Sequence, residues 1–148
     1  MEVGTLCQRL VFTIRRSDEV SRAAQLMREK HVGYLVVVEL DPLARPVGVL
    51  TDRDIVVGVV AREVDPKALR VGDIMTVNII TARESDSVEA ALQKMREFGV
   101  RRLPVVNDRG ELVGILAMDD VLKVIAGNAQ QVLNVIRNER QIEGVIRQ

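Results

Sequence analysis

One stretch of this sequence, Gly48-Val-Leu-Thr-Asp-Arg-Asp-Ile55, occurs again in altered form as Gly114-Ile-Leu-Ala-Met-Asp-Asp-Val121. In both copies an apolar run typical of a strand is followed at once by polar residues typical of a helix start. A shift of 68 positions also aligns Val3–Val38 with Val71–Val106. Sixteen of these 36 positions are identical, whereas average residue usage gives about two or three matches by chance. The chain therefore contains an internal duplication.

The duplication divides the chain. The segment from Val38 to Gly48 is two residues longer than the equivalent segment of the second copy, from Val106 to Gly114. Two prolines within residues 40–46 predict a loop at this point. We expect a first repeat over residues 3–64, a second over 71–127, and a C-terminal helical extension over 128–148.

The second copy shows the expected order of elements. Ile79–Thr81 predicts a short strand, Asp86 followed by Glu89 is typical of a helix N-cap, and Gly99 suits the end of that helix. Two further strands, joined by a tight turn, are expected over Arg102–Asn107 and Glu111–Ala117.

The first copy repeats this order, with Asp18 as the cap, a helix over Val20–Lys30, and strands over Tyr34–Glu39 and Pro46–Leu50. One copy of about sixty residues buries too little surface to be comfortable alone. We therefore expect an α/β (α+β) fold in which two repeats pack sheet to sheet with pseudo-twofold symmetry, which creates paired clefts.

The composition excludes several functions. The chain has 148 residues, 21 basic and 21 acidic side chains, and three aromatic residues (Phe12, Tyr34 and Phe98). Zero net charge without a basic block is not typical of a general nucleic-acid binder, and three aromatic residues cannot form base-stacking platforms. A single Cys and a single His, His31, exclude a structural zinc site and an internal disulfide. We expect no enzymatic activity, no catalytic cofactor and no metal.

The N-terminal segment has an acid at Glu2 and lacks the order of a signal peptide. The longest apolar run, Ile55–Ala61, is far shorter than the roughly 20 residues of a membrane helix. The single Cys7 suits a reducing compartment, so we expect a cytoplasmic protein without a membrane partner.

The start of the helix after Thr51 is a candidate anion site. Exposed N–H groups there, the Thr51 hydroxyl and Arg53 suit a phosphate, and Asp54 suits the hydroxyl groups of a ribose. On spacing alone another interpretation is favoured, in which Thr51 is an N-cap and Asp52 and Asp54 complement the helix dipole.

The second copy keeps Asp120 but has Ala117 and Asp119 at the positions of Thr51 and Arg53, so two sites would be unequal.

The adjacent Arg101 and Arg102 either reach a phosphate across the interface or lie in solvent. His31 aligns with Gly99 and is interpreted as a helix-end residue, and Cys7 aligns with Met75 and is interpreted as a small apolar residue. Residues 130–148 predict a loosely amphipathic helix that packs on its own chain or on a second subunit.

Together these residues resemble a known family. The Ser-Asp-x-Val helix starts, Arg101-Arg-Leu-Pro-Val-Val-Asn-Asp-Arg-Gly110, Gly48–Ile55 and Asp73-Ile-Met75 are similar to those of tandem CBS domains, named for cystathionine beta-synthase. The resemblance covers about Val3–Ala126. It implies a two-repeat disc (a Bateman module) that is not catalytic, commonly forms homodimers, and binds adenosyl ligands such as AMP, ADP, ATP or S-adenosylmethionine.

The family pattern G-h-x-[ST]-x-x-D is met by Gly48, Thr51 and Asp54, which implies Thr51 on phosphate and Asp54 on ribose. The resemblance implies a first nucleotide site of Thr51, Arg53, Asp54, Ile80, Thr81, Val100, Arg101 and Arg102. A weaker second site would use Thr5, Phe12, Val32, Gly33 and Asp120, with phosphate binding in doubt because of Ala117.

We therefore expect a dimeric adenine-nucleotide sensor, with AMP as the favoured ligand, that signals to a separate effector protein. The alternative is a structural interaction module that binds no ligand. Nucleic-acid binding through the exposed arginines is the less favoured possibility.

Overall fold

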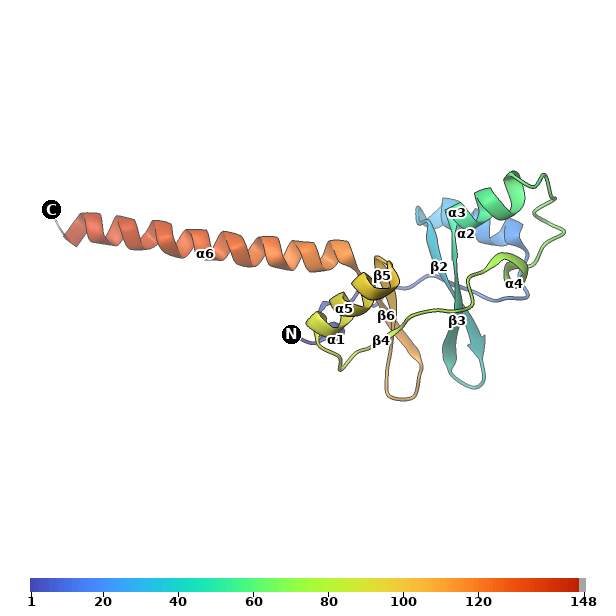
Figure 1. The fold of residues 1–148 in the computed structure, drawn as a ribbon, viewed down its shortest axis with the longest axis horizontal. Coiled ribbons are helices and arrows are strands. Elements are labelled where there is room, and N and C mark those ends of the chain that lie inside the picture. The colour runs from blue at the N-terminus through green and yellow to red at the C-terminus, as the bar shows by residue number, and fades with distance from the viewer. Residues whose placement is uncertain (147–148) are drawn as a thin grey trace.

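The computed structural model describes residues 1–146 and contains two three-stranded sheets (Figure 1). The strands are β1 (Thr13–Ile14), β2 (Tyr34–Leu40) and β3 (Ala44–Thr51) in one sheet, and β4 (Ala82–Arg83), β5 (Arg102–Val106) and β6 (Leu112–Ala117) in the other. In each sheet the second strand is central: the first strand pairs with it in parallel, and the third pairs with it antiparallel. The expected α+β fold of two similar repeats is confirmed.

Helices surround the sheets. They are α1 (Val3–Leu6), α2 (Val20–Lys30), α3 (Asp52–Ile55), a π-helical turn η1 (Val56–Val60), α4 (Val71–Ile74), α5 (Val88–Phe98) and α6 (Met118–Ile146). The equivalent helices α2 and α5 each bury one stripe at helical spacing, Val20, Ala23 and Met27 in α2 and Val88, Ala91 and Met95 in α5. These are identical residues in the two copies, so the duplication preserved the packing of the helix on its sheet.

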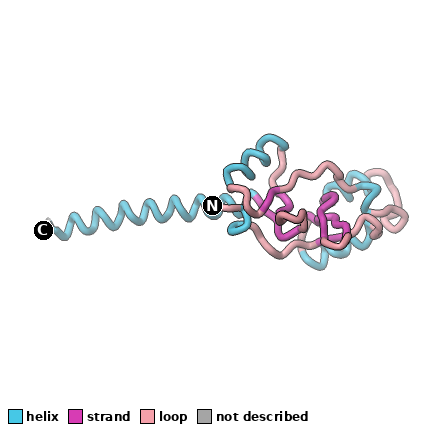
Figure 2. Tube along the Cα trace, turned by 90° about the horizontal axis from the view of Figure 1, so that it is seen from below, coloured by secondary structure: helices cyan, strands magenta, loops and turns pink. Residues whose placement is uncertain are grey.

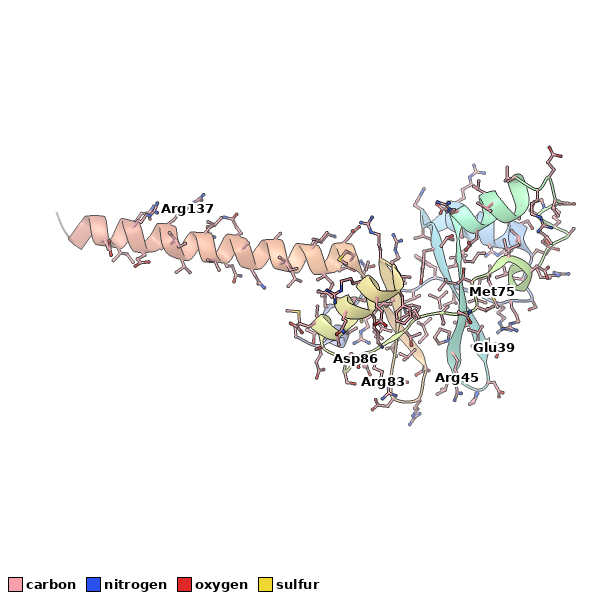
Figure 3. All side chains as sticks on the ribbon, in the orientation of Figure 1. Glu39, Arg45, Met75, Arg83, Asp86 and Arg137 are labelled. Atoms are coloured by element: carbon pink, nitrogen blue, oxygen red, sulfur yellow. The ribbon has the colours of Figure 1, made fainter. Side chains whose placement is uncertain are left out.

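The helix caps differ by one residue from the expectation. Helix α5 begins after Ser87, whose hydroxyl accepts from Ala90 N at 3.1 Å, and α2 begins after Glu19, which makes no side-chain cap bond. Asp86 instead accepts from Arg83 N at 2.9 Å, in the turn that leads into the helix (Figure 3). Asp18 makes the same bond in the first copy. The carboxylate therefore closes the turn after the strand instead of capping the helix.

Two strand predictions were wrong in their bounds. The first strand of the second repeat is Ala82–Arg83, while Ile79 and Ile80 lie in the loop before it. The loop expected over residues 40–46 is shorter, because Leu40 pairs with Ala44 and Pro46 lies within β3. Proline is tolerated there because β3 is an edge strand and the pairing register shifts beside it.

The first segment of each repeat packs on the sheet of the other repeat. Val3 is fully buried in the core of the second repeat, and Val71 is fully buried in the core of the first. Backbone bonds fix the exchange: Val3 N donates to Asp86 O and Val71 N donates to Asp18 O, both at 2.8 Å. Neither hydrophobic core is complete without residues that belong, in sequence, to the other copy.

Gly48 and Gly114 allow the exchanged segments to approach the sheets. A Cβ atom at Gly48 would lie 2.8 Å from the carbonyl oxygen of Thr76, and one at Gly114 would lie 2.8 Å from Cys7 Sγ. Beside Gly48, Thr76 exchanges two backbone bonds with Val49. The glycine of the repeated motif is therefore required by the packing of the exchanged segments.

Helix α6 leaves the body of the molecule, and the two perpendicular views agree on this (Figures 1 and 2). Its first turn packs on the second repeat through Val121, which is 2% exposed. Farther along, Val132 and Ile142 are both 60% exposed, and Arg137 lies far from the sheets (Figure 3). The predicted helix is present as far as Ile146, and residues 147–148 of the expected extension lie outside the described residues. The outer part of α6 does not pack on its own chain. In the described part of the chain, no helix combines the length and apolar character needed to span a bilayer.

Candidate functional site

A first cleft of about 280 Å³ is lined by residues of β2, β3 and β5 and by the segment that precedes β4. Of the residues expected at the first site, its wall contains Thr51, Ile80, Val100, Arg101 and Arg102. Of these five residues, the first repeat supplies Thr51, and the second supplies Ile80, Val100 and both arginines. The pseudo-twofold packing therefore brings together side chains that are distant in sequence.

The cleft wall also contains residues that sequence reasoning missed, namely Tyr34, Val49, Thr76, Asn78, Ile79 and Pro104. Tyr34 is equivalent to Arg102 in the duplication. Because equivalent residues near a twofold axis face one another, this equivalence is the signal that points to Tyr34.

Three expected residues lie outside this wall. Arg53 is exposed in the first turn of α3. The carbonyl of Thr81 accepts from Lys94 Nζ at 2.9 Å. Asp54 lies behind Thr51 in a reciprocal cap: Thr51 N donates to Asp54 Oδ2 at 2.9 Å, and Asp54 N donates to Thr51 Oγ1 at 3.1 Å. The capping interpretation of these two residues is thus present in the structure, and Thr51 keeps its own hydroxyl proton for a bond to another acceptor.

The N–H groups at the start of α3 are not free, contrary to the expectation from sequence. Asp52 N donates to Gly33 O at 3.0 Å, Arg53 N donates to Asp52 Oδ1 at 2.8 Å, and Asp54 N donates to Thr51. The Gly33 carbonyl, the Asp52 carboxylate and the Thr51 hydroxyl have satisfied the donors that would otherwise attract an anion. A phosphate in this cleft would depend on side chains, namely the Thr51 hydroxyl and the arginines.

The two arginines have different surroundings. Arg101 NH2 lies 3.7 Å from Asp119 Oδ1, but both side chains are well exposed, so this ion pair contributes little to stability. Arg102 Cζ lies 5.6 Å from the centroid of the Tyr34 ring. Burial raises the pKa of Tyr34 to about 12, although the nearby charge of Arg102 acts in the opposite direction. Tyr34 is therefore a neutral donor at neutral pH.

A second cleft of about 390 Å³ lies on the other side of this arginine–tyrosine contact. Of the residues expected there, its wall contains Phe12, Val32, Gly33 and Asp120. Thr5 lies in a separate open hollow beside Glu2 and Arg9. The wall further includes Gln8, His31, Tyr34, Arg102, Asp119 and Lys123, of which Lys123 follows Asp120 by one helical turn.

His31 ends helix α2 in the left-handed conformation, with φ of 54°, as Gly99 does after α5 with φ of 66°. Its interpretation as a helix-end residue is confirmed. The ring nevertheless belongs to the wall of the second cleft, because the chain turns into β2 directly after it.

Asp120 differs from Asp54 in its bonding. Its Oδ1 accepts from Gln8 Nε2 at 3.1 Å, but its Oδ2 is buried and has no hydrogen-bond partner among the described residues. Ala117 stands where Thr51 would close a reciprocal cap. A buried carboxylate oxygen without a donor is unfavourable by about 1–3 kcal/mol, so this position gains from any donor that enters the cleft.

Comparison with known proteins is consistent with this architecture. The model of the CBS domain family matches the chain twice, over residues 3–61 and 71–127. An uncharacterized protein of Methanopyrus kandleri is 38% identical over 125 residues, which are 84% of this chain but 62% of that protein. The chain thus spans less than two thirds of that relative. A CBS domain-containing protein of Bacillus subtilis, YhcV, is 36% identical over 111 residues, or 75% of this chain and 76% of the relative.

Solved structures share the fold. A CBS domain protein from Pyrobaculum aerophilum complexed with AMP has a TM-score of 0.72 and 31% identity, covering 81% of this chain and 89% of that one. The CBS domain pair of protein MJ0100, in complex with 5′-methylthioadenosine and S-adenosyl-L-methionine, has a TM-score of 0.73 and 26% identity, covering 86% and 98%. With two family matches, two equivalent sheets and two clefts between them, the chain belongs to the CBS domain family as a tandem pair.

Proposed function

We propose that the chain is a regulatory module that binds an adenosyl ligand, with AMP favoured, between its two CBS domains. One observation carries the proposal: the first cleft unites the hydroxyl of Thr51 with an apolar wall and two arginines from the opposite repeat. A nucleotide needs these three features together, because its base is flat and apolar and its phosphate is anionic. Similar structures with AMP or S-adenosylmethionine bound support the same ligand class.

In this proposal the adenine ring lies between Ile80 and Val100, and the phosphate accepts bonds from Thr51 and the arginines. A charge-assisted bond from a guanidinium is the stronger of these contacts. Asp54 binds the ribose hydroxyl groups. Its Oδ2 is held by Thr51 N, which fixes the orientation of the carboxylate from which Oδ1 bonds the sugar.

The second cleft accepts a nucleoside more weakly. A ribose hydroxyl would supply the donor that Asp120 Oδ2 lacks. Ala117 offers no hydroxyl to a phosphate, and Asp119 on the same wall adds a negative charge.

The proposed output is a change in the population of states that bind a separate effector protein, since a ligand shifts an equilibrium only by its differential affinity for the states. We further propose that the chain forms a homodimer. The exposed apolar side chains of α6, such as Val132 at 60% and Leu133 at 48%, support a partner for this helix.

Isothermal titration calorimetry with AMP, ADP, ATP and S-adenosylmethionine tests the ligand. We expect AMP to bind and Asp54→Ala to weaken binding by tenfold or more, about the contribution of one hydrogen bond to a charged group. Asp73→Ala is the matched control: Asp73 accepts from Arg70 N at 2.8 Å at the start of α4, which contributes no residue to the cleft wall, whereas Asp54 is bonded to the wall residue Thr51. No binding at millimolar ligand, or equal losses in the two variants, contradicts the proposal.

The exposed apolar stripe of α6 favours a second candidate, a ligand-independent interaction module. In that case capture of the effector is indifferent to AMP and is abolished by deletion of residues 130–148. A regulatory module instead changes its effector affinity when AMP is added.

A further inference from the structure

Among the residues that the structure describes, Tyr34 and Arg102 are the two that line both clefts. They are equivalent in the duplication, 68 residues apart, and each begins the central strand of its sheet. Their side chains meet, with the guanidinium carbon 5.6 Å from the ring centroid. The pseudo-twofold axis therefore passes between an aromatic ring and a single positive charge.

The charge of Arg102 is not committed to an acidic partner. Within residues 1–146 it forms no ion pair, whereas its neighbour Arg101 is paired with Asp119 at 3.7 Å. Its contact with the Tyr34 ring is a cation–π interaction, which is weaker than bonds from a guanidinium to a phosphate. The side chain is exposed, so it is able to leave the ring for a phosphate on either side.

The two clefts depend on Arg102 to different degrees. The first also offers Arg101 and the Thr51 hydroxyl. The second has Ala117 in place of the hydroxyl, and its wall carries two aspartates beside Lys123. A phosphate in the second cleft therefore depends on Arg102 more than a phosphate in the first cleft does. The first cleft nevertheless binds a phosphate more tightly, because it has more groups that can contact the phosphate.

We propose that Arg102 binds a phosphate group in one cleft at a time and thereby couples the two clefts. This inference rests on the proposed function. A phosphate-bearing nucleoside in the first cleft draws the guanidinium there and weakens the binding of a second such ligand. An uncharged nucleoside in the second cleft does not contact Arg102. It therefore binds equally well whether or not the first cleft holds a phosphate-bearing ligand. By linkage, the effect is the same in the reverse direction.

The test measures the affinity of the second cleft for AMP in two states. In one state the first cleft holds AMP, and in the other a tryptophan side chain occupies it. Ile80→Trp fills the first cleft, so AMP binding to this variant reports the second cleft alone. Calorimetry of the wild-type protein gives the affinity for the second AMP when the first is bound. We expect the second AMP to bind about fivefold or more weakly to the wild-type protein than AMP binds to Ile80→Trp, the lower end of typical coupling between sites. If Ile80→Trp does not fold, Asn78→Trp at an exposed position of the same wall replaces it.

Two further variants identify the residue responsible. In an Arg102→Gln background the two affinities become equal within about twofold. An Arg96→Gln background retains the difference, because Arg96 is exposed on α5 and lines neither cleft. With adenosine in place of AMP as the second ligand, no difference is expected in any background.

Equal AMP affinities in the wild type and Ile80→Trp overturn the coupling, as does a difference that persists in Arg102→Gln. If AMP binds to Ile80→Trp but the wild-type protein binds no second AMP, the coupling is supported, and AMP in the first cleft then excludes AMP from the second. If Ile80→Trp binds adenosine but not AMP, the second cleft takes no phosphate and the coupling is wrong, while the proposed function stands. Failure of the wild-type protein to bind any AMP contradicts the proposed function itself.

Discussion

Arg102 lies over the ring of Tyr34, with 5.6 Å between the guanidinium carbon and the ring centroid, although the duplication that relates the two positions began with one residue type. Each residue pairs with the last residue of its neighbouring strand, Tyr34 with Thr51 and Arg102 with Ala117. The two hairpins therefore differ at both members of this pair, and one cleft holds the Thr51 hydroxyl where the other has Ala117.

Tyr34 is expected to ionise with a midpoint near pH 12 in the folded protein, because burial raises its pKa from 10 to about 12. The chain has one tyrosine and no tryptophan, so ultraviolet difference absorbance reports this group alone. Because Arg102 lowers this pKa, Arg102→Gln is expected to raise the midpoint further. A midpoint of 10 at a pH where circular dichroism still shows the folded state would contradict the burial of this ring.

The same shift makes stability depend on pH. The folded state holds the Tyr34 proton more tightly than the unfolded state, so its contribution is fully present below pH 10. That contribution is lost as the pH rises from 10 through about 12. The loss in the free energy of unfolding is on the order of 2 kcal/mol. Urea titrations at pH 9 and pH 11 measure about half of this loss, because Tyr34 of the folded protein is still mostly protonated at pH 11. Tyr34→Phe is expected to flatten the dependence.

His31→Gly is expected to stabilise the fold by about 0.5–1 kcal/mol, because His31 occupies the left-handed region at the end of α2. Gly99→Ala at the equivalent position is the matched reverse: nothing lies within 4 Å of the added Cβ, so the expected loss of about 1 kcal/mol comes from backbone strain alone. Thermal unfolding of both variants checks the pair. Changes of the same sign in the two variants would show that φ is not the cause.

The fold was predictable because the repeat itself encodes it. Two copies of one pattern, each too small for a stable core, imply two equivalent sheets and paired clefts. The exchange of the opening segments was not predictable, because residues 3–8 fit either sheet equally well by periodicity and only the three-dimensional path of the chain decides between them. The shift of the caps from Asp18 and Asp86 has a local cause, since the carboxylates bond to Arg15 N and Arg83 N instead.

Sequence spacing also gave two interpretations of Thr51 and Asp54, and the structure shows that the cap is real. A cap and a ligand site are not exclusive, because capping uses Asp54 Oδ2 and the Thr51 lone pair and leaves the hydroxyl proton available. What spacing could not show is that the helix N–H groups already have partners. Two of these partners, Asp52 Oδ1 and Thr51 Oγ1, are local, but the partner of Asp52 N is the carbonyl of Gly33, 18 residues before Thr51 in the sequence.

Gly48→Ala and Gly114→Ala are each expected to lower the free energy of unfolding by about 1–3 kcal/mol, because the added Cβ overlaps an exchanged segment. At Gly48 the overlap is with the Thr76 carbonyl, and at Gly114 it is with Cys7 Sγ and the Gln8 carbonyl. Gly127→Ala, in the interior of α6 with nothing within 4 Å, is the control and is expected to cause no loss. Urea unfolding measures all three, and a loss in Gly127→Ala as large as the others would remove the packing explanation.

Cys7 provides a direct probe of the exchanged segment. Its side chain is buried on the second sheet, and burial raises the pKa of the thiol above its ordinary value, with Arg9 acting in the opposite direction. The thiolate is the nucleophile, so alkylation by iodoacetamide at pH 8 is expected to be slow and to require opening of residues 3–8. Gly114→Ala pushes against Cys7 Sγ and is expected to accelerate alkylation. Gly48→Ala carries a similar overlap on the other sheet and is expected to leave the rate unchanged as long as the protein stays folded. Equal acceleration in both variants would mean that the thiol reacts through global unfolding, in which case the N-terminal segment does not open independently of the rest of the fold.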